Sequence, residues 1–551
     1  MNKPLLGSLV VATLLLGDAS AATMYERFEA MEKEMQRLQN ELANLKAEQA
    51  EAEPASRGED EEADAEESDD EGEKEEGYSE DEADEEEEID VNEAIEELQE
   101  TVTELNKATA GNHLKLGVDF RTSYDSVNYE MADGTRHENN DVFTNRLWLN
   151  MNWAANENIS FTGQLAYNKT YGQRFGFTGG QGVGFEDFDW IANENAGADG
   201  TVRVKSAYYF YRNDTLLGAD IPWTFSLGRR PSTNGHLINL RDNDPAASPS
   251  GHGINVEFDG LSSKLGLEKL TGVPGMYVKL CAGQGATNAT EKFSPTPYAT
   301  NTSDPLKDIH LGGFIFVPYD NGQFSVGTQI YGASNVPGQS LDMTGSPFPG
   351  PGFNANFGNP STLVPVGDFY NGSIYMMTNG IGNEWSDFLD DTTFFVSGAI
   401  SRTNPDDGLD TFGQEKSMFG STEMETGYSY WVGLNMPSLF SEDGRFGLEF
   451  NHGSKHWGTI TYAEDTLIGS KIAARGNAYE AYFTEPLIDD IFSLQIRYTY
   501  IDYNYAGGDG FFGSYTGNPL SIEEAAAIGG STAGSIVDKS QDVRVYLRYR
   551  Y

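Results

Sequence analysis

Apolar and polar side chains alternate along the chain from residue 114 to its end. In the last nine residues, Val543, Val545, Leu547, Tyr549 and Tyr551 alternate with arginine and tyrosine. Because successive side chains of a strand point to opposite faces, each such segment has one apolar and one polar face. The pattern predicts about sixteen strands, with fourteen to eighteen as the alternative counts, over residues 114–121, 147–153, 159–167, 202–211, 223–229, 253–261, 276–283, 309–317, 324–331, 369–377, 393–401, 428–436, 445–451, 478–484, 492–503 and 543–551.

The connections between these segments alternate in length. Those after odd-numbered segments are mostly long, such as residues 122–146 and 332–368, whereas those after even-numbered segments are mostly short, such as residues 154–158 and 318–323. Transmembrane barrels have this asymmetry because they carry tight turns on one side of the membrane and long loops on the other. A soluble sandwich gives no reason for strict alternation. The sequence therefore predicts an all-β fold, an antiparallel transmembrane β-barrel over residues 111–551.

Both ends of the chain indicate export. Lys3 precedes an apolar run over residues 5–16, and Ala19-Ser20-Ala21 supplies small residues for a signal peptidase, so residues 1–21 are predicted to be a signal peptide. No later apolar run is long enough for a membrane-spanning helix. The five outward residues of the last segment, Val543 to Tyr551, resemble the C-terminal assembly signal of bacterial outer-membrane barrels. The resemblance implies recognition by the barrel assembly machinery and contact with outer-membrane lipid in a Gram-negative bacterium.

Acidic residues are concentrated before the barrel. Residues 51–100 contain 28 acidic and 2 basic residues, a net charge of −26 within a whole-chain charge of −50. Such a segment cannot bury a core and repels itself, so residues 51–88 are predicted to be an acidic disordered spacer. Binding of hard divalent cations is the alternative. The remaining residues 101–551 are acidic as well, which argues against nucleic-acid binding because that function requires a basic patch.

Short heptad repeats flank the acidic spacer and predict a coiled coil over residues 22–50 and a second coiled-coil helix over residues 89–110. The apolar positions recur at spacings of three and four. They are Met24, Phe28, Met31, Met35, Leu38, Leu42 and Leu45 in the first repeat, and Val91, Ile95, Leu98, Val102 and Leu105 in the second. Isolated helices of this length are marginal in water, so each needs a partner. The candidates are the other repeat, sister chains in a homo-oligomer, with a trimer favoured, and the chain's own barrel, on which an amphipathic helix would lie or act as a plug.

Charged side chains occupy the predicted inward face of the barrel. The strand pattern places basic residues at most of these positions, so we expect a water-filled and mainly cationic lining. The predicted pore-lining residues are Lys115, Asp119, Arg121, Arg146, Arg497, Arg544 and Arg548.

The connection after the fifth segment contains the most distinctive stretch, Gly228-Arg229-Arg230-Pro231-Ser232-Thr233-Asn234-Gly235. In position it resembles the third external loop of trimeric general porins, which folds into the lumen and sets basic against acidic side chains. The resemblance implies a constriction with Arg229, Arg230 and Arg241 opposite Asp242 and Asp244. An external loop with ordinary surface ion pairs is the alternative. The chain also resembles an uncharacterised family of bacterial outer-membrane proteins with an N-terminal helical segment, in which a Gly-Arg-Arg-Pro-Ser-Thr stretch occurs; this resemblance implies a fold and a location but no substrate.

Catalysis is not predicted. The candidates His452, Ser454, His456 and Asp465 share one predicted external loop, but their spacing does not make them converge. Two histidines four residues apart would need a helix to bind zinc, and Gly453 and Gly458 argue against one. No phosphate-binding glycine loop and no cofactor motif is recognised.

The sequence therefore predicts an outer-membrane porin for passive diffusion of ions and small hydrophilic solutes, with its N-terminal extension in the periplasm. One alternative is a barrel that sheaths a periplasmic electron carrier or another plug protein. A second is an envelope tether whose coiled coil contacts the cell wall. The sign of the ion preference stays open, because arginines favour anions at the wall whereas acidic loops favour cations at the mouths.

Overall fold

The computed structural model describes residues 114–172, 199–247, 249–303, 306–339, 363–382, 385–406, 419, 421–461, 464–507 and 519–551. The chain divides into two compact units, Met1–His113 and Leu114–Tyr551, and all described residues belong to the second. The predicted signal peptide, both predicted coiled-coil segments and the acidic spacer lie outside the described residues. They stay predictions, as does the trimer that depends on them.

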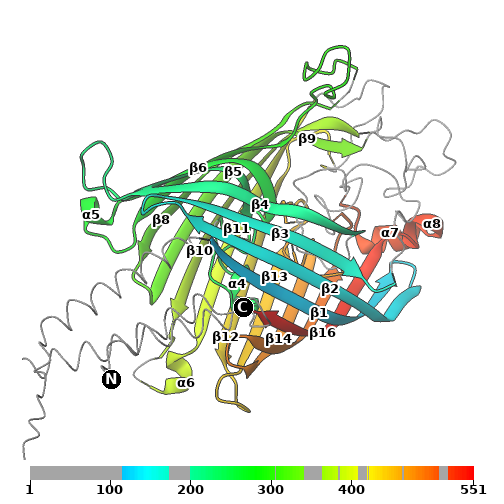
Figure 1. The fold of residues 1–551 in the computed structure, drawn as a ribbon. Helices are drawn as coiled ribbons and strands as arrows, with labels where there is room; N and C mark the ends of the chain where they lie inside the picture. Colours follow the sequence, from blue (N-terminus) through cyan, green and yellow to red (C-terminus); the bar gives the residue numbers. More distant parts are fainter. Residues whose placement is uncertain are drawn as a thin grey trace, which may run out of the picture. The chain divides into compact units, whose positions relative to one another are not determined.

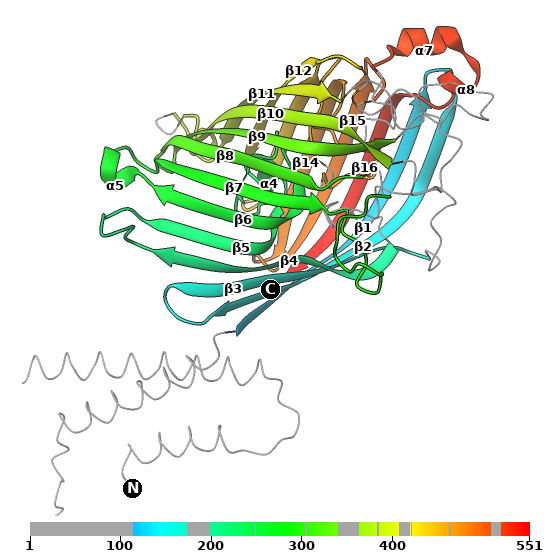
Figure 2. The same cartoon turned by 90° about the horizontal axis from the view of Figure 1, so that it is seen from above.

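The described part of the chain forms a closed antiparallel barrel of sixteen strands, which confirms the predicted fold class (Figures 1 and 2). Each strand pairs with its sequence neighbours, and β1 pairs with β16 to close the ring. The strands are β1 (Leu114–Met131), β2 (Arg136–Ala154), β3 (Ile159–Thr170), β4 (Asp199–Asn213), β5 (Trp223–Ser232), β6 (Val256–Gly266), β7 (Tyr277–Ala286), β8 (Ile309–Asp320), β9 (Phe324–Gln339), β10 (Leu363–Asn379), β11 (Thr393–Pro405), β12 (Thr426–Pro437), β13 (Arg445–Gly453), β14 (Gly476–Ile488), β15 (Phe492–Tyr503) and β16 (Val537–Arg550).

Short helices occur only between strands in the described residues. They are α4 (Ile238–Arg241), α5 (Glu268–Thr271), α6 (Asp387–Asp390), α7 (Ile522–Ile528) and α8 (Gly530–Ala533). None of these helices has the length and apolar character needed to cross a bilayer.

The first predicted long connection, residues 122–146, is mostly strand. β1 continues to Met131 and β2 begins at Arg136, so the two form a long hairpin joined by a short turn. The prediction of a loop was wrong because the outward side chains in this stretch, such as Ser126 and Asn128, are polar and break the apolar alternation. Backbone pairing does not require that alternation once the hairpin has formed.

The two faces of the barrel wall differ in chemistry, as the alternation predicts. Outward side chains are mainly large and apolar, and many of them are exposed, including Leu116, Phe120, Leu149, Phe314, Ile330, Ile374, Ile400, Leu448, Ile496 and Leu547. Inward side chains are mainly polar or charged and largely buried, such as Ser123, Asn371, Ser397, Glu449 and Arg544. An apolar outer surface with no open sheet edge is the arrangement that lipid requires of a β-structure.

Two long connections fold into the barrel. One joins β5 to β6 and carries α4, which lies within the ring of strands (Figure 2). The other joins β13 to β14 over residues 454–475, most of which are buried in the described part. The two connections pair with each other through a bridge between Ile254 and Ile460.

A row of glycines lets β5 and β6 leave the wall. Gly228 pairs with Gly260, and Gly260 pairs with Gly283 on β7. A Cβ on Gly228 would stand 2.4 Å from the carbonyl oxygen of Ala207, and one on Gly260 would stand 2.2 Å from that of Ala282. Gly228 also has a φ of 134°, which favours glycine. Only glycine permits this close approach of neighbouring backbones.

Beyond Arg229 and Asp259, the described residues of β5 and β6 pair only with each other, and both faces of this hairpin are buried. On one face, Val256 and Phe258 pack in an apolar cluster with Tyr331 and Phe369 of β9 and β10. On the other face, the carboxylate of Glu257 accepts hydrogen bonds from Lys205 of β4 at 2.8 Å and from Arg229 at 3.1 Å. The hairpin therefore stands inside the barrel and leads the chain into the connection with α4.

Candidate pore constriction

The acidic end of the β5–β6 connection contacts the inner wall at β16. Asp242 accepts a hydrogen bond of 2.9 Å from the Tyr546 hydroxyl, and Asp244 accepts one of 3.1 Å from Nη2 of Arg548. Arg550 also forms an ion pair with Asp244. Burial raises the pKa of the Asp242 carboxyl, but Arg241 and Arg548 outweigh that effect and lower the pKa to about 2. Asp242 is therefore a fixed negative charge beside the basic wall.

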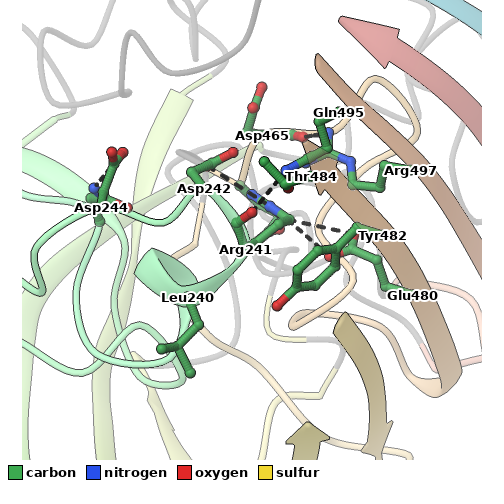
Figure 3. Close-up of polar contacts among 12 residues, drawn as sticks. Leu240, Arg241, Asp242, Asp244, Asp465, Glu480, Tyr482, Thr484, Gln495 and Arg497 are labelled. Atoms are coloured by element: carbon green, nitrogen blue, oxygen red, sulfur yellow. Dashed lines mark hydrogen bonds and ion pairs between the residues drawn. The ribbon is translucent and has the colours of Figure 1, made fainter. Parts of the chain in front are cut away.

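Arg241, next to these aspartates, points toward a different set of carboxylates (Figure 3). Its Nη1 lies 2.6 Å from Glu464 Oε1 and 3.3 Å from Glu480 Oε1. Lys471 pairs with the same Glu480 and, at 2.6 Å, with Glu449. All five side chains are almost completely buried. Two cations from the inward connections thus neutralise most of a three-carboxylate cluster at the inner face of β13 and β14.

Asp465 holds the β13–β14 connection against the seam of the barrel. Its Oδ1 lies 2.8 Å from Nη2 of Arg121 and 3.0 Å from Nη1 of Arg544, on the two strands that close the ring. Arg497 donates to the Asp465 backbone carbonyl. Burial raises the pKa of the Asp465 carboxyl, but Arg121 and Arg544 outweigh this and hold it well below its usual value.

Six of the seven predicted lining residues gather on this wall. Arg548 donates to Asp119 at 3.1 Å, Arg146 lies 3.5 Å from the same carboxylate, and the Arg146 guanidinium stacks 3.6 Å above the Trp148 ring. The six residues come from β1, β2, β15 and β16; they are Asp119, Arg121, Arg146, Arg497, Arg544 and Arg548. Lys115 lies apart from them, in a pocket of about 450 Å³ that also includes Asn150, Gln164 and Tyr208.

The five predicted constriction residues divide into two groups. Arg241, Asp242 and Asp244 lie inside the barrel on the connection that carries α4. Arg229 and Arg230 lie on β5 and contact neither aspartate: Arg229 pairs with Glu257, and Arg230 donates to the Ser262 hydroxyl. The Gly-Arg-Arg-Pro-Ser-Thr stretch therefore places its two arginines on β5, whereas the three charged residues that follow it lie on the connection inside the barrel.

Sequence reasoning did not identify the role of the β13–β14 connection. It treated Asp465 as a member of an external loop with His452, Ser454 and His456, but Asp465 pairs with Arg121 while His452 contacts Asn477 and His456 lies near Glu425. These four residues do not converge. A signal was present, because the connection carries Trp457, Ile460, Ile468 and Ile472, which an exposed loop would not favour.

Apolar packing fills the side of the lumen next to β10–β12. Leu237 and Ile238 of the β5–β6 connection and Ile472 of the β13–β14 connection pack against the inward rings of Phe395 and Trp431. Just beyond them, His252 hydrogen-bonds Ser397 at 2.7 Å and Ser429 at 2.9 Å, and burial lowers the pKa of its imidazole to about 3. The described parts of the two connections therefore contact the inner wall from β8 round to β1. We call the remaining side, along β2–β7, the free side of the lumen.

Comparisons with known proteins found one matching family and several solved structures that resemble this barrel. A family described as "Protein of unknown function (DUF3373)" matches residues 136–551, from the start of β2 to the end. No curated protein matches the chain. Similar solved structures include the anion-selective porin from Comamonas acidovorans, at 11% identity and a TM-score of 0.41, covering 80% of this chain and 99% of that one. OprB of Pseudomonas putida has 11% identity, a TM-score of 0.42 and coverage of 82% and 96%. OmpF of Salmonella typhi, in complex with daunomycin, has 10% identity, a TM-score of 0.39 and coverage of 80% and 99%.

Proposed function

The chain belongs to the family DUF3373, and we propose that it forms an outer-membrane channel for passive diffusion of ions and small hydrophilic solutes. The observation that carries this proposal is the closed barrel with apolar side chains outside and charged side chains inside. Lipid tolerates such a sheet because all its backbone hydrogen bonds are made between strands. A lining of polar and charged side chains is what a water-filled path through such a barrel requires.

The proposed constriction lies where the β5–β6 connection meets β16. It consists of Asp242 and Asp244 on the connection and Arg548 and Arg550 on the wall, whereas Arg241 is directed to Glu464 and Glu480. Fixed charges at close range act strongly on ions, because the surrounding protein has a low dielectric constant. Arg229 and Arg230 are not part of this proposed constriction, since their partners lie on β4 and β6.

The filled lumen favours this channel over a sheath for another protein. Two connections of the chain itself occupy the barrel, and Trp431 and Trp457 are fully buried between them and the wall. A folded electron carrier would have to displace this packing and leave the carboxylates of Glu464 and Asp465 without their cations. Breaking buried ion pairs of this kind costs several kcal/mol each, about 3–5 kcal/mol by analogy with measured cases.

Planar-bilayer recording on the purified protein tests the proposal. We expect discrete conductance steps in potassium chloride, small in size because two connections of the chain occupy part of the lumen. Folding is checked independently by the heat-dependent mobility shift that closed barrels show on gels. A folded, membrane-inserted protein that gives no conductance steps would contradict the channel.

A further inference from the structure

The free side of the lumen carries cations whose partners differ from those of the arginines on the wall formed by β1, β2 and β16. On β1, β2 and β16, Arg121, Arg146, Arg544 and Arg548 each form an ion pair with a carboxylate. On β5 and β6, the inward Arg230 and Lys264 have aromatic and hydroxyl partners instead. These two strands border the free side of the lumen.

Arg230 and Lys264 have no carboxylate at ion-pair distance within the described ranges of the chain. Arg230 donates to the Ser262 hydroxyl, and its guanidinium carbon lies 5.1 Å from the centre of the Tyr208 ring. Its Nε makes no hydrogen bond in the structure. The ammonium of Lys264 lies 3.9 Å from the centre of the Tyr277 ring. Cation–π contacts hold both side chains in place but leave their positive charge uncancelled.

A third cation adds to this charge. Lys279 on β7 is the direct cross-strand partner of Lys264, and both project to the inner face, as do Ser262 and its partner Cys281. Like charges directly opposite each other destabilise a sheet, so packing alone does not account for the pair. We define Arg230, Lys264 and Lys279 as the basic lane. Asp320, at the end of β8, is the carboxylate whose charge attracts the Lys264 ammonium, but the two groups lie beyond ion-pair distance.

The basic lane adjoins the pocket beside β1–β4. Tyr208 lines that pocket and also lies under Arg230, so the two features share a side chain. The pocket offers hydrogen-bond donors from Asn150, Gln164 and Lys115. A solute on the free side of the lumen would therefore meet amide and ammonium donors and then three positive charges, with no carboxylate of the described residues paired to Arg230 or Lys264.

We propose that the basic lane binds small oxyanions, with phosphate as the type ligand, and makes the channel prefer anions. Guanidinium and ammonium groups donate charge-assisted hydrogen bonds to phosphate oxygens, and the Ser262 hydroxyl can add another. The ion pairs at the constriction are locally balanced and contribute little net charge, so the preference is set by Arg230 and Lys264, which have no ion-pair partner among the described residues. This inference rests on the proposed channel function for its transport consequence, whereas oxyanion binding itself does not require conductance.

Two measurements on the full-length protein test this inference separately from the channel. Equilibrium dialysis with radiolabelled inorganic phosphate measures binding to the detergent-solubilised protein, and the reversal potential in a potassium chloride gradient measures ion preference. We expect saturable phosphate binding that Arg230→Gln and Lys264→Gln each weaken about tenfold, as expected for the loss of one charge-assisted hydrogen bond. Both variants should also move the reversal potential toward cation preference, and phosphate should reduce the chloride current of the unaltered protein.

Lys269→Gln is the matched control, because it removes one positive charge from an exposed ammonium that pairs with Asp220 outside the lumen. It should leave phosphate binding and the reversal potential unchanged. Phosphate binding without conductance would support the basic lane and overturn the channel. Conductance with cation preference, or phosphate binding that is absent or equal in all variants, would overturn the basic lane and leave the channel standing. A heat-dependent mobility shift in each variant excludes misfolding as the cause.

Discussion

Nη1 of Arg544 lies 3.0 Å from Oδ1 of Asp465, and both side chains are fully buried inside the barrel. Arg544 belongs to the last strand, and Asp465 belongs to the connection between β13 and β14. Arg121 on β1 binds the same carboxylate from the other side of the seam. One aspartate on an inward connection therefore ties together the two strands that close the ring.

Replacing Asp465 with asparagine should destabilise the barrel by about 3–5 kcal/mol, because buried Arg121 would lose its carboxylate partner and buried Arg544 would keep only Asp125. Thermal unfolding followed by the gel mobility shift measures this loss. The same variant should increase single-channel conductance, since the β13–β14 connection loses its anchor. Asp538→Asn is the control: Asp538 pairs with Lys539 on the same strand but is partly exposed, so we expect a change of about 0–1 kcal/mol. Equal stability of the two variants would contradict the anchoring role of Asp465.

Neutralising the loop side of the proposed constriction should strengthen anion preference. In Asp242→Asn/Asp244→Asn, Arg548 loses its ion pair with Asp244 and Arg550 loses its only ion-pair partner among the described residues, so the β16 wall gains net positive charge. The reversal potential in a salt gradient should shift toward anions relative to the unaltered protein. Asp220→Asn, which removes one negative charge at the exposed turn between β4 and β5, should cause no shift. An unchanged reversal potential in the double variant would place the selectivity elsewhere in the lumen.

Lowering the pH should weaken the packing of the β5–β6 connection against the barrel wall. Buried His252 has a pKa of about 3 in the folded barrel, whereas a released imidazole has one of 6.5. Between these values the released state binds more protons, so stability falls as the pH falls below 6.5, by up to about 1.4 kcal/mol per pH unit, and is unaffected above it. His236 on the same connection has a pKa lowered mainly by burial and adds to the effect.

The contribution of His252 is separated by His252→Gln, which can hydrogen-bond Ser397 or Ser429 but does not titrate. We expect its midpoint of thermal unfolding to fall less between pH 7.5 and pH 5 than that of the unaltered protein. His137→Gln, at an exposed position of β2, should retain the full acid effect. The role of His252 would be disproved by identical pH profiles for all three proteins.

The glycine row should tolerate no side chain. In Gly260→Ala, the new Cβ would stand 2.2 Å from the Ala282 carbonyl oxygen, so β6 could not leave the wall without a backbone shift, at a cost of about 1–3 kcal/mol or more. We expect a lower yield of folded barrel, measured as the heat-shifted band after refolding into detergent. Gly398→Ala is the matched control, since nothing lies within 4 Å of its Cβ. Similar folded yields for the two variants would show that the bend does not depend on Gly260.

The wall of the barrel was predictable from the sequence because its signal is local. Alternation along residues 543–551 fixes which side chains face lipid, and a period of two is a property of the strand backbone itself. The same alternation predicted that Arg121, Arg544 and Arg548 face inward. The prediction of a loop at residues 122–146 was wrong for the same reason. The apolar alternation is absent there because β1 and β2 extend as a polar hairpin.

The pairing of charges inside the barrel depends on contacts between residues that are far apart in the chain. Asp465 and Arg121 are separated by 344 positions, and Arg241 and Glu480 by 239. Such contacts form only when the two connections fold into the barrel. This folding depends on the glycine bend in β5 and β6 and on the burial of apolar side chains such as Ile472 against the wall. No local period encodes these choices. The local pattern of side chains therefore specified a barrel with a polar interior, whereas long-range packing decided where the two connections lie inside it and which cations have no ion-pair partner among the described residues.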